Sequence, residues 1–304
     1  MIGKSWGGFN GLQVAARRPE PLKAVITLCS TDDRYHDDVH YMGGTMLASN
    51  MLWWASTMLA YNARPADPAT VGEKWWEVWF ERLEKTPPFV EAWVGHQRRD
   101  DYWKHGSVCE DYSDIEIPIF AVGGWADGYT NAVFRLMEGL PGPKKALIGP
   151  WAHEYPEVVQ PGPQIGFLQE SLRWWDYWLK GIDTGIMDET IFRAYIQDSV
   201  PPKDYYEYRP GRWIAEEGWP SASVKTARLY LDKNRLQNDL PEEEAITIGG
   251  VQEHSLYHET WCPFGQPGDM ALDQRLENGM AEVFTTGPLE EDIDLFGFQS
   301  YRWK

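Results

Sequence analysis

Cysteine, basic side chains and long apolar segments are all scarce in this sequence of 304 residues. The three cysteines, Cys29, Cys109 and Cys262, form no C-x-x-C pair, so no disulfide framework is expected, and Cys29 is interpreted as an inert buried thiol. Lys and Arg number 28 against 46 Asp and Glu, and the net charge of −18 argues against nucleic acid as a partner. Polar residues interrupt the most apolar stretch, residues 42–61, so no membrane span is predicted.

The clearest motif lies at the start of the chain. Residues 3–7, GKSWG, match G-x-S-x-G, the nucleophile elbow in which a serine occupies a sharp turn between a strand and a helix. Glycine on both sides of Ser5 permits the tight turn because it carries no Cβ. Residues 9–18 follow as an expected helix, and the apolar run 24–29 follows as a buried strand. Turn, helix and strand in this order favour an elbow over a glycine-rich surface turn.

Only Met1 and Ile2 precede the elbow, where a complete buried strand is expected. We therefore expect the chain to begin inside a catalytic domain, with the first half of its sheet missing. No signal peptide is recognisable, which favours a cytoplasmic location over export without deciding the compartment.

A serine hydroxyl becomes an effective nucleophile only beside a base that an acid orients. In α/β-hydrolases the acid and then the histidine follow the serine, each directly after a later strand. Asp127 follows the predicted strand 117–122, and His153 follows the predicted strand 144–148. The alternatives are an Asp-Gly turn and a packed histidine. Because parallel strands end at one edge of the sheet, we expect Ser5, Asp127 and His153 to converge there as nucleophile, acid and base.

The character of the sequence changes along the chain. Residues 1–35 and 113–186 combine buried strands with amphipathic helices, which is typical of the α/β class. Residues 36–112 between them are helical and rich in tryptophan, and their apolar stripe at 75–83 is interpreted as core packing. Residues 187–304 hold short alternating runs between Gly and Pro turns, which predicts a β-sandwich or jelly roll. The runs expected as strands are 191–196, 225–231, 245–248 and 281–285.

In combination these motifs resemble the cocaine esterase-like hydrolases of the CocE/NonD family, relatives of the X-prolyl dipeptidyl peptidases. The matching segments are GKSWGG at 3–8, DDYW at 100–103, GGWADGY at 123–129, GPWAH at 149–153, LRWWDYWLKGIDTG at 172–185 and VFTTGPLEED at 283–292. The resemblance implies an α/β-hydrolase core, a helical cap inserted at 36–112, and a C-terminal jelly roll of the galactose-binding type at 187–304 that the chain leaves incomplete. It also implies the triad Ser5, Asp127 and His153.

The same resemblance implies acyl transfer on carboxylic esters, amides or X-Pro dipeptidyl bonds, with no metal and no organic cofactor. One oxyanion donor is expected to be the backbone N–H of Trp6. A tyrosine upstream of the elbow supplies the second donor in the family, and no residue here can be assigned to that role. Related α-amino acid ester hydrolases bind the substrate amine with acidic residues shortly after the catalytic Asp, whereas Gly128–Thr130 carries none.

The expected partner is therefore a small ester or amide or a short peptide, and the sequence does not indicate an oligomeric state. Trp53, Trp54 and Trp151 are candidates for an apolar acyl pocket, although packing is at least as good an explanation for each of them.

Two other classes of function stay open. Residues 36–40, HDDVH, imitate H-E-x-x-H, in which two histidines one helical turn apart bind zinc. A catalytically impaired hydrolase remnant that carries a jelly roll could instead serve as a carbohydrate- or ligand-binding module. Chelator-sensitive activity would favour the first alternative, and glycan binding by a Ser5→Ala variant would favour the second.

Overall fold

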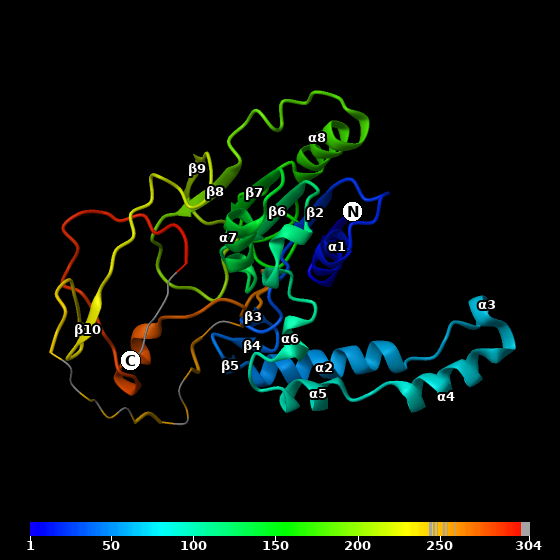
Figure 1. Cartoon of the computed structure of the whole chain (residues 1–304). Coiled ribbons are helices and arrows are strands. Elements are labelled where there is room, and N and C mark those ends of the chain that lie inside the picture. Colours follow the sequence, from blue (N-terminus) through cyan, green and yellow to red (C-terminus); the bar gives the residue numbers. More distant parts are fainter. Residues whose placement is uncertain are drawn as a thin grey trace. The chain divides into compact units, whose positions relative to one another are not determined.

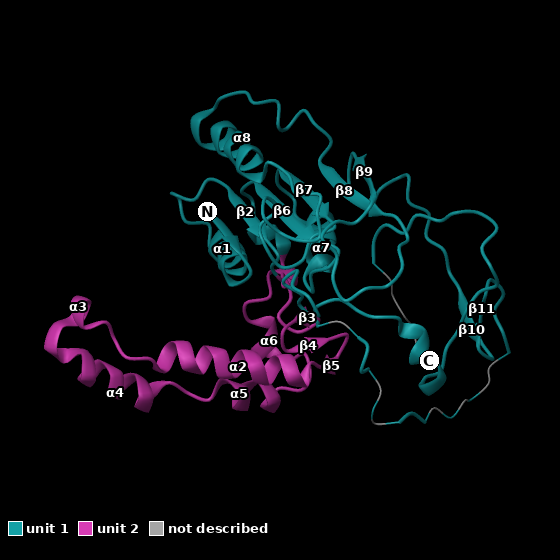
Figure 2. Ribbon diagram, turned by 180° about the vertical axis from the view of Figure 1, so that it is seen from behind, with its two compact units in different colours: residues 1–30, 112–304 teal, residues 31–111 magenta. Residues whose placement is uncertain are grey.

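The computed structural model describes residues 1–242, 245, 247, 249–251, 253, 255–258 and 260–298. The chain divides into two compact units (Figure 2). The first contains residues 1–30 and 112–304, and the second contains residues 31–111.

A six-stranded sheet forms the centre of the first unit (Figure 1). Its strands are β1 (Ile2–Lys4), β2 (Val25–Leu28), β6 (Ile119–Gly124), β7 (Lys144–Gly149), β8 (Phe192–Gln197) and β9 (Gly211–Glu216). The strand order is β1-β2-β6-β7-β8-β9, and every neighbouring pair is parallel except β8 and β9. All residues of β2 and β6 are buried, as expected for parallel strands that are covered on both faces.

Helices α1 (Trp6–Ala16) and α8 (Phe167–Lys180) cover opposite faces of the sheet, while α7 (Thr130–Gly139) packs on β6 and β7. Gly11 of α1 lies against Val25. Trp174 of α8 belongs to the core that contains Ile26, and consecutive strand residues point to opposite faces. Helix α8 ends at Gly181, whose φ of 67° is a left-handed conformation that favours glycine.

The second unit is a small helical body with a three-stranded sheet. The strands are β3 (Asp37–Asp38), β4 (Tyr41–Met42) and β5 (Thr45–Met46), and the helices are α2 (Ala48–Ala63), α3 (Pro68–Val71), α4 (Trp75–Lys85), α5 (Phe89–Gly95) and α6 (Asp101–Lys104). Its core gathers Tyr35, Tyr41, Met51, Ala55, Trp93 and Trp103. The stripe at 75–83 is not part of it, because no residue of α4 is buried, so its interpretation as core packing was wrong. A role for this unit as a cap stays a prediction.

Short 3-10 helices complete the secondary structure. They are η1 (Gly72–Lys74) and η2 (Val108–Glu110) in the second unit, and η3 (Tyr112–Asp114), η4 (Gln274–Leu276) and η5 (Asn278–Met280) in the first.

The region 187–304 departs from the jelly roll expected from the sequence. The run 191–196 forms β8, which joins the central sheet beside β7, because Phe192, Ala194 and Tyr195 are all buried and a strand within a covered sheet needs apolar residues on both faces. Of the other expected runs, 225–231 supplies part of β10 (Tyr230–Asp232), which pairs with β11 (Arg235–Gln237). Run 281–285 supplies one bridge, and 245–248 falls partly outside the described residues. The described residues of this region therefore form no jelly roll.

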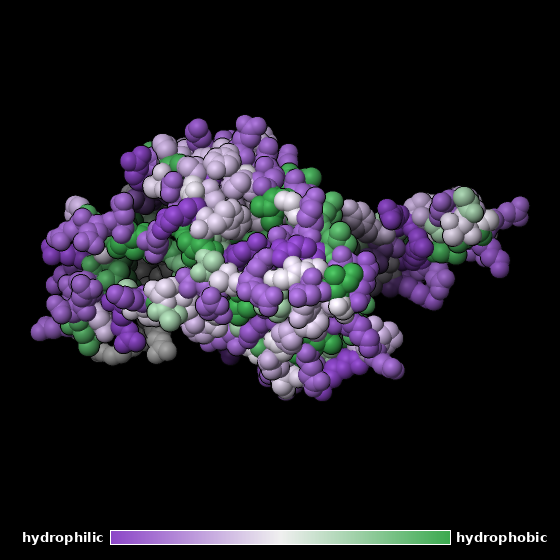
Figure 3. Space-filling model, turned by 90° about the horizontal axis from the view of Figure 1, so that it is seen from above, coloured by the Kyte–Doolittle hydropathy of each residue, from purple (hydrophilic) through white to green (hydrophobic). Residues whose placement is uncertain are grey.

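Hydrophilic residues cover most of the face that Figure 3 shows, and hydrophobic residues form small scattered groups between them. Among the described helices, none combines the length and the apolar character needed to cross a membrane.

Candidate active site

Ser5 occupies a strained turn between β1 and α1. Its backbone has φ 57° and ψ −123°, a positive φ that is rare for a residue other than glycine and that is typical of functional sites. Its N–H donates to the Leu28 carbonyl at 2.9 Å, and its carbonyl accepts from the Phe9 N–H at 2.9 Å. These hydrogen bonds connect the backbone of Ser5 to β2 and to the beginning of α1. Ser5 therefore lies at the carboxyl end of β1 in the conformation of a nucleophile elbow.

Close approach of α1 to the strands explains part of the glycine pattern. A Cβ on Gly3 would lie 2.2 Å from the carbonyl carbon of Gly7, and a Cβ on Gly8 would lie 2.6 Å from Thr27 Oγ1. A Cβ on Gly7 would meet nothing within 4 Å. The expectation that both motif glycines avoid a clash thus holds for Gly3, whereas Gly8 rather than Gly7 is the second constrained position.

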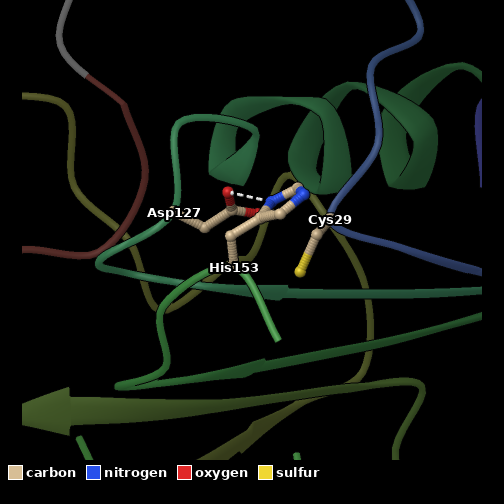
Figure 4. A group of neighbouring side chains, drawn as sticks. All are labelled: Cys29, Asp127 and His153. Atoms are coloured by element: carbon tan, nitrogen blue, oxygen red, sulfur yellow. Dashed lines mark hydrogen bonds and ion pairs between the residues drawn. The ribbon is translucent and has the colours of Figure 1, made fainter. Parts of the chain in front are cut away.

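His153 and Asp127 are in direct contact at the same edge of the sheet (Figure 4). His153 Nδ1 lies 2.9 Å from Asp127 Oδ1, and the two side chains are 4% and 0% exposed. Exclusion of water strengthens this hydrogen bond and restricts the orientation of the imidazole. The other carboxylate oxygen, Asp127 Oδ2, is buried without a hydrogen-bond partner among the described residues.

The loops that carry Asp127 and His153 are joined by backbone hydrogen bonds beyond the ends of β6 and β7. Trp125 N–H donates to the Gly149 carbonyl at 2.9 Å, and Ala126 N–H donates to the Trp151 carbonyl at 3.1 Å. A Cβ on Gly124 would lie 2.0 Å from that Trp151 carbonyl oxygen, so only glycine allows the loops to approach so closely. The main chain therefore positions Asp127 and His153 relative to each other.

A segment distant in the sequence, residues 261–264, packs on His153. His153 N–H donates to the Pro263 carbonyl at 2.8 Å, and the Phe264 ring lies 5.3 Å from the imidazole. The ring of Tyr129 lies 5.5 Å from the imidazole and 5.1 Å from the ring of Trp261. The sequence contains no motif that marks this segment, and the prediction missed it.

Cys29 is a further neighbour of Asp127 and His153 (Figure 4). One potential ligand atom from each of Cys29, Asp127 and His153 lies within 4.8 Å of the others. Cys29 is 4% exposed and has φ 47°, again a positive value. Burial, followed by the Asp127 carboxylate, raises the pKa of its thiol well above the usual value, so the thiol is neutral near pH 7. Cys262 donates its thiol to Asp127 Oδ1 at 3.8 Å.

The neighbours of Ser5 and His153 in the chain form an ion pair. Lys4 Nζ lies 2.7 Å from Glu154 Oε1. Burial raises the pKa of Glu154, but the hydrogen bonds from Lys4 and from the Tyr155 N–H outweigh it, and the pKa is below its ordinary value.

The predicted pocket residues have different positions. Trp151 is 1% exposed, and its Nε1 donates to the Pro163 carbonyl at 2.8 Å, so the pocket role predicted for it was wrong and it is a core residue. Trp53 is 56% exposed on α2 of the second unit, with its ring 6.0 Å from that of Trp54. A substrate-binding role for Trp53 and Trp54 stays a prediction. Trp6 is the first residue of α1 and is 38% exposed.

The zinc motif proposed at 36–40 is not on a helix. Asp37 and Asp38 form β3, which a hairpin joins to β4. His36 and His40 therefore lack the one-turn helical spacing that H-E-x-x-H requires. His36 instead contacts Asp33, with 2.7 Å between Nδ1 and Oδ2. Within the described part of the chain, the group of three candidate metal ligands is Cys29, Asp127 and His153.

Comparison with known proteins gives consistent matches. Residues 1–155 match the X-Pro dipeptidyl-peptidase (S15) family. A protein of Mycobacterium bovis named as a serine esterase is 26% identical over 214 residues, which are 65% of this chain and 31% of that protein. A CocE/NonD family hydrolase from Staphylococcus aureus superimposes with a TM-score of 0.55 at 17% identity, over 78% of this chain and 37% of that one. An α-amino acid ester hydrolase superimposes with a TM-score of 0.63 at 15% identity, over 96% of this chain and 53% of that one.

These matches bear out the resemblance to CocE/NonD hydrolases and the α/β-hydrolase class of the fold. The chain spans less than half the length of the curated relatives that it matches.

Proposed function

The chain belongs to the X-Pro dipeptidyl-peptidase (S15) family of hydrolases, and from this premise we propose that it carries the catalytic residues of a serine hydrolase that cleaves carboxylic esters. The observation that carries the proposal is the buried hydrogen bond between His153 and Asp127 at 2.9 Å. This hydrogen bond lies at the edge of the sheet where β1 ends and Ser5 follows.

The proposed reaction is acyl transfer. Ser5 Oγ attacks the substrate carbonyl while His153 accepts the hydroxyl proton, and Asp127 holds the imidazole with Nδ1–H donating to Oδ1. The oxyanion of the tetrahedral intermediate faces the backbone N–H of Trp6, at the positive end of the α1 dipole. The leaving alcohol takes its proton from His153. Water, activated by the same imidazole, then attacks the acyl-enzyme and releases the acid.

Two features support a substrate whose acyl group is uncharged. The aromatic rings of Tyr129 and Phe264 lie beside the imidazole, at 5.5 and 5.3 Å. Residues 128–130 contain no carboxylate that could bind a substrate ammonium group. The carboxylate of Glu154, next to His153 in the chain, already forms an ion pair with Lys4. An ester is therefore proposed ahead of an amide or of an X-Pro dipeptide with its free amino terminus.

The test combines an activity-based probe with two substrates. The chain is treated with a fluorophosphonate, and hydrolysis of p-nitrophenyl butyrate is compared with hydrolysis of Ala-Pro-p-nitroanilide. Because the chain supplies one assigned oxyanion donor, we expect labelling and at most weak ester hydrolysis, both lost in Ser5→Ala and kept in Ser56→Ala, a control serine that donates to the Leu52 carbonyl within α2. Labelling that survives in Ser5→Ala would refute the nucleophile. Faster cleavage of the anilide than of the ester would refute the substrate class.

A further inference from the structure

The group around the catalytic acid contains donor atoms that the proposed hydrolysis does not use. Cys29, Asp127 and His153 follow β2, β6 and β7, which are adjacent in the sheet, and one ligand atom from each lies within 4.8 Å of the others. All three residues are buried. A thiol, a carboxylate and an imidazole are the side chains that bind zinc in proteins.

A second and independent observation points to a ligand. Asp127 Oδ2 is buried without a hydrogen-bond partner among the described residues, although a carboxylate oxygen withdrawn from water normally has one. A cation between the three side chains would satisfy this oxygen. Such a charge would also be compensated locally, since the thiol and the carboxylate become its anionic ligands.

A fourth donor is within reach. Cys262 Sγ lies 3.8 Å from Asp127 Oδ1, outside the group of three but next to its carboxylate, so a movement of this side chain could add a second sulfur atom. Ligand atoms of a tetrahedral zinc ion at ordinary bond lengths are about 3.3–3.8 Å apart. The ligand atoms of Cys29, Asp127 and His153 would therefore have to approach one another by about 1 Å to bind the ion. Adjustments of this size are available to side chains by small χ rotations.

We propose that Cys29, Asp127 and His153, joined by Cys262, form an inhibitory site for a thiophilic divalent cation, with Zn²⁺ as the expected ion. Binding displaces the thiol protons into solvent, and no electron is transferred. The cation takes the carboxylate that orients His153 and one nitrogen of the imidazole, so the histidine can no longer accept the serine proton. The inhibition rests on the proposed function, whereas the cation site itself does not.

The first experiment detects the site without any enzyme activity. Co²⁺ is titrated into the reduced chain, and the absorption of a thiolate-to-cobalt charge-transfer band is recorded. We expect a band that saturates at one cation per chain, that Zn²⁺ abolishes, that weakens in Cys29→Ala, and that disappears when Cys29 and Cys262 are both replaced by alanine. Cys109→Ala is the matched control because Cys109 is not one of the three grouped ligands, and it should keep the band. Absence of the band from the parent chain would overturn the proposal.

The second experiment connects the site to hydrolysis. Zn²⁺ should inhibit cleavage of p-nitrophenyl butyrate reversibly, with recovery on addition of EDTA, and the inhibition should weaken about 10-fold or more in Cys29→Ala but not in Cys109→Ala. Cys29→Ser, which keeps the size of the side chain, serves if the alanine variant does not fold. Equal inhibition of the parent and both Cys29 variants would refute a role for this site.

The Ser5→Ala variant separates the two proposals. It retains all four donors, so it should bind Co²⁺ like the parent although it hydrolyses nothing. A parent chain that shows the band but no Ser5-dependent hydrolysis would contradict the serine hydrolase and leave the cation site standing. Ser5-dependent hydrolysis with no band would contradict the cation site and support the serine hydrolase.

Discussion

Lys4 and Glu154 form a 2.7 Å ion pair between the residue that precedes Ser5 and the residue that follows His153. In the sheet, β2 and β6 separate β1 from β7, so this pair connects two chain segments that the strand order keeps apart. The elbow and the loop of His153 therefore approach each other beyond the ends of the strands. The proposed proton transfer from Ser5 to His153 requires the two segments to approach in this way.

The ion pair should make stability depend on pH. Because the pKa of Glu154 is lower in the folded protein than in the unfolded chain, its contribution is complete above the unfolded value of about 4.3 and is lost as the pH falls through the folded value. We expect Glu154→Gln to lower Tm by about 2 °C at pH 7 and by less at about pH 3. Thermal unfolding followed by circular dichroism at both pH values measures this difference.

Glu81→Gln is the control for that measurement. The pair of Lys85 and Glu81 is close in space but its side chains are 73% and 58% exposed, so its removal should leave Tm unchanged. An equal loss of Tm in Glu154→Gln at pH 3 and pH 7 would show that the ion pair is not the cause.

Replacement of Asp127, the proposed acid, should affect turnover far more than binding. In Asp127→Asn the amide keeps the shape of the side chain but no longer selects the imidazole tautomer in which Nδ1 carries the proton. We expect kcat for p-nitrophenyl butyrate to fall by about 10³–10⁴-fold with KM nearly unchanged. Asp114→Asn, an exposed control, should keep full activity. A loss of less than tenfold in Asp127→Asn would remove Asp127 from the triad.

The glycines of the elbow should differ in their tolerance of alanine. In Gly3→Ala and Gly8→Ala the new Cβ meets backbone or a buried hydroxyl at 2.2 and 2.6 Å, and we expect a loss of about 2–3 kcal/mol in the free energy of unfolding. Gly7→Ala adds a Cβ with nothing within 4 Å, and alanine favours the helix by about 0.5–1 kcal/mol. Urea unfolding of the three variants gives these values, and a Gly7→Ala variant as unstable as the other two would contradict the packing described for α1.

The second unit has its own acid-sensitive carboxylate. Asp33 accepts hydrogen bonds from Tyr35 N–H at 2.9 Å and from His36 Nδ1 at 2.7 Å. Burial raises its pKa, but these bonds and Arg99 outweigh burial and lower it to about 2. The contribution of Asp33 to stability is therefore complete above about pH 4 and is lost as the pH falls to about 2.

Removal of that carboxylate should destabilise the unit at neutral pH. We expect Asp33→Asn to cost about 2 kcal/mol at pH 7, visible as faster limited proteolysis within residues 31–111, and to make no difference near pH 2 in tryptophan fluorescence. Asp101→Asn is the control in the same unit, since its side chain is 99% exposed. Proteolysis of both variants at the rate of the parent would refute the role of Asp33.

The sequence alone determined the features that depend on neighbouring residues. The elbow at Ser5, the strand that leads to Asp127 and the strand that leads to His153 are each encoded within a few consecutive residues. Parallel strands end at a common edge, so their spacing was sufficient to predict that Asp127 and His153 meet.

Only the tertiary structure decided the features that depend on residues far apart in the chain. Pro263 and Phe264 contact His153 across more than a hundred residues, Cys29 lies beside Asp127, and these contacts have no local sequence pattern. The run 191–196 illustrates the same limit, because a short apolar strand fits a covered parallel sheet as well as a jelly roll, and only its pairing with β7 distinguishes the two. The pattern of apolar residues indicates which faces of a strand are buried. Which strand or helix buries them depends on contacts between residues far apart in the chain.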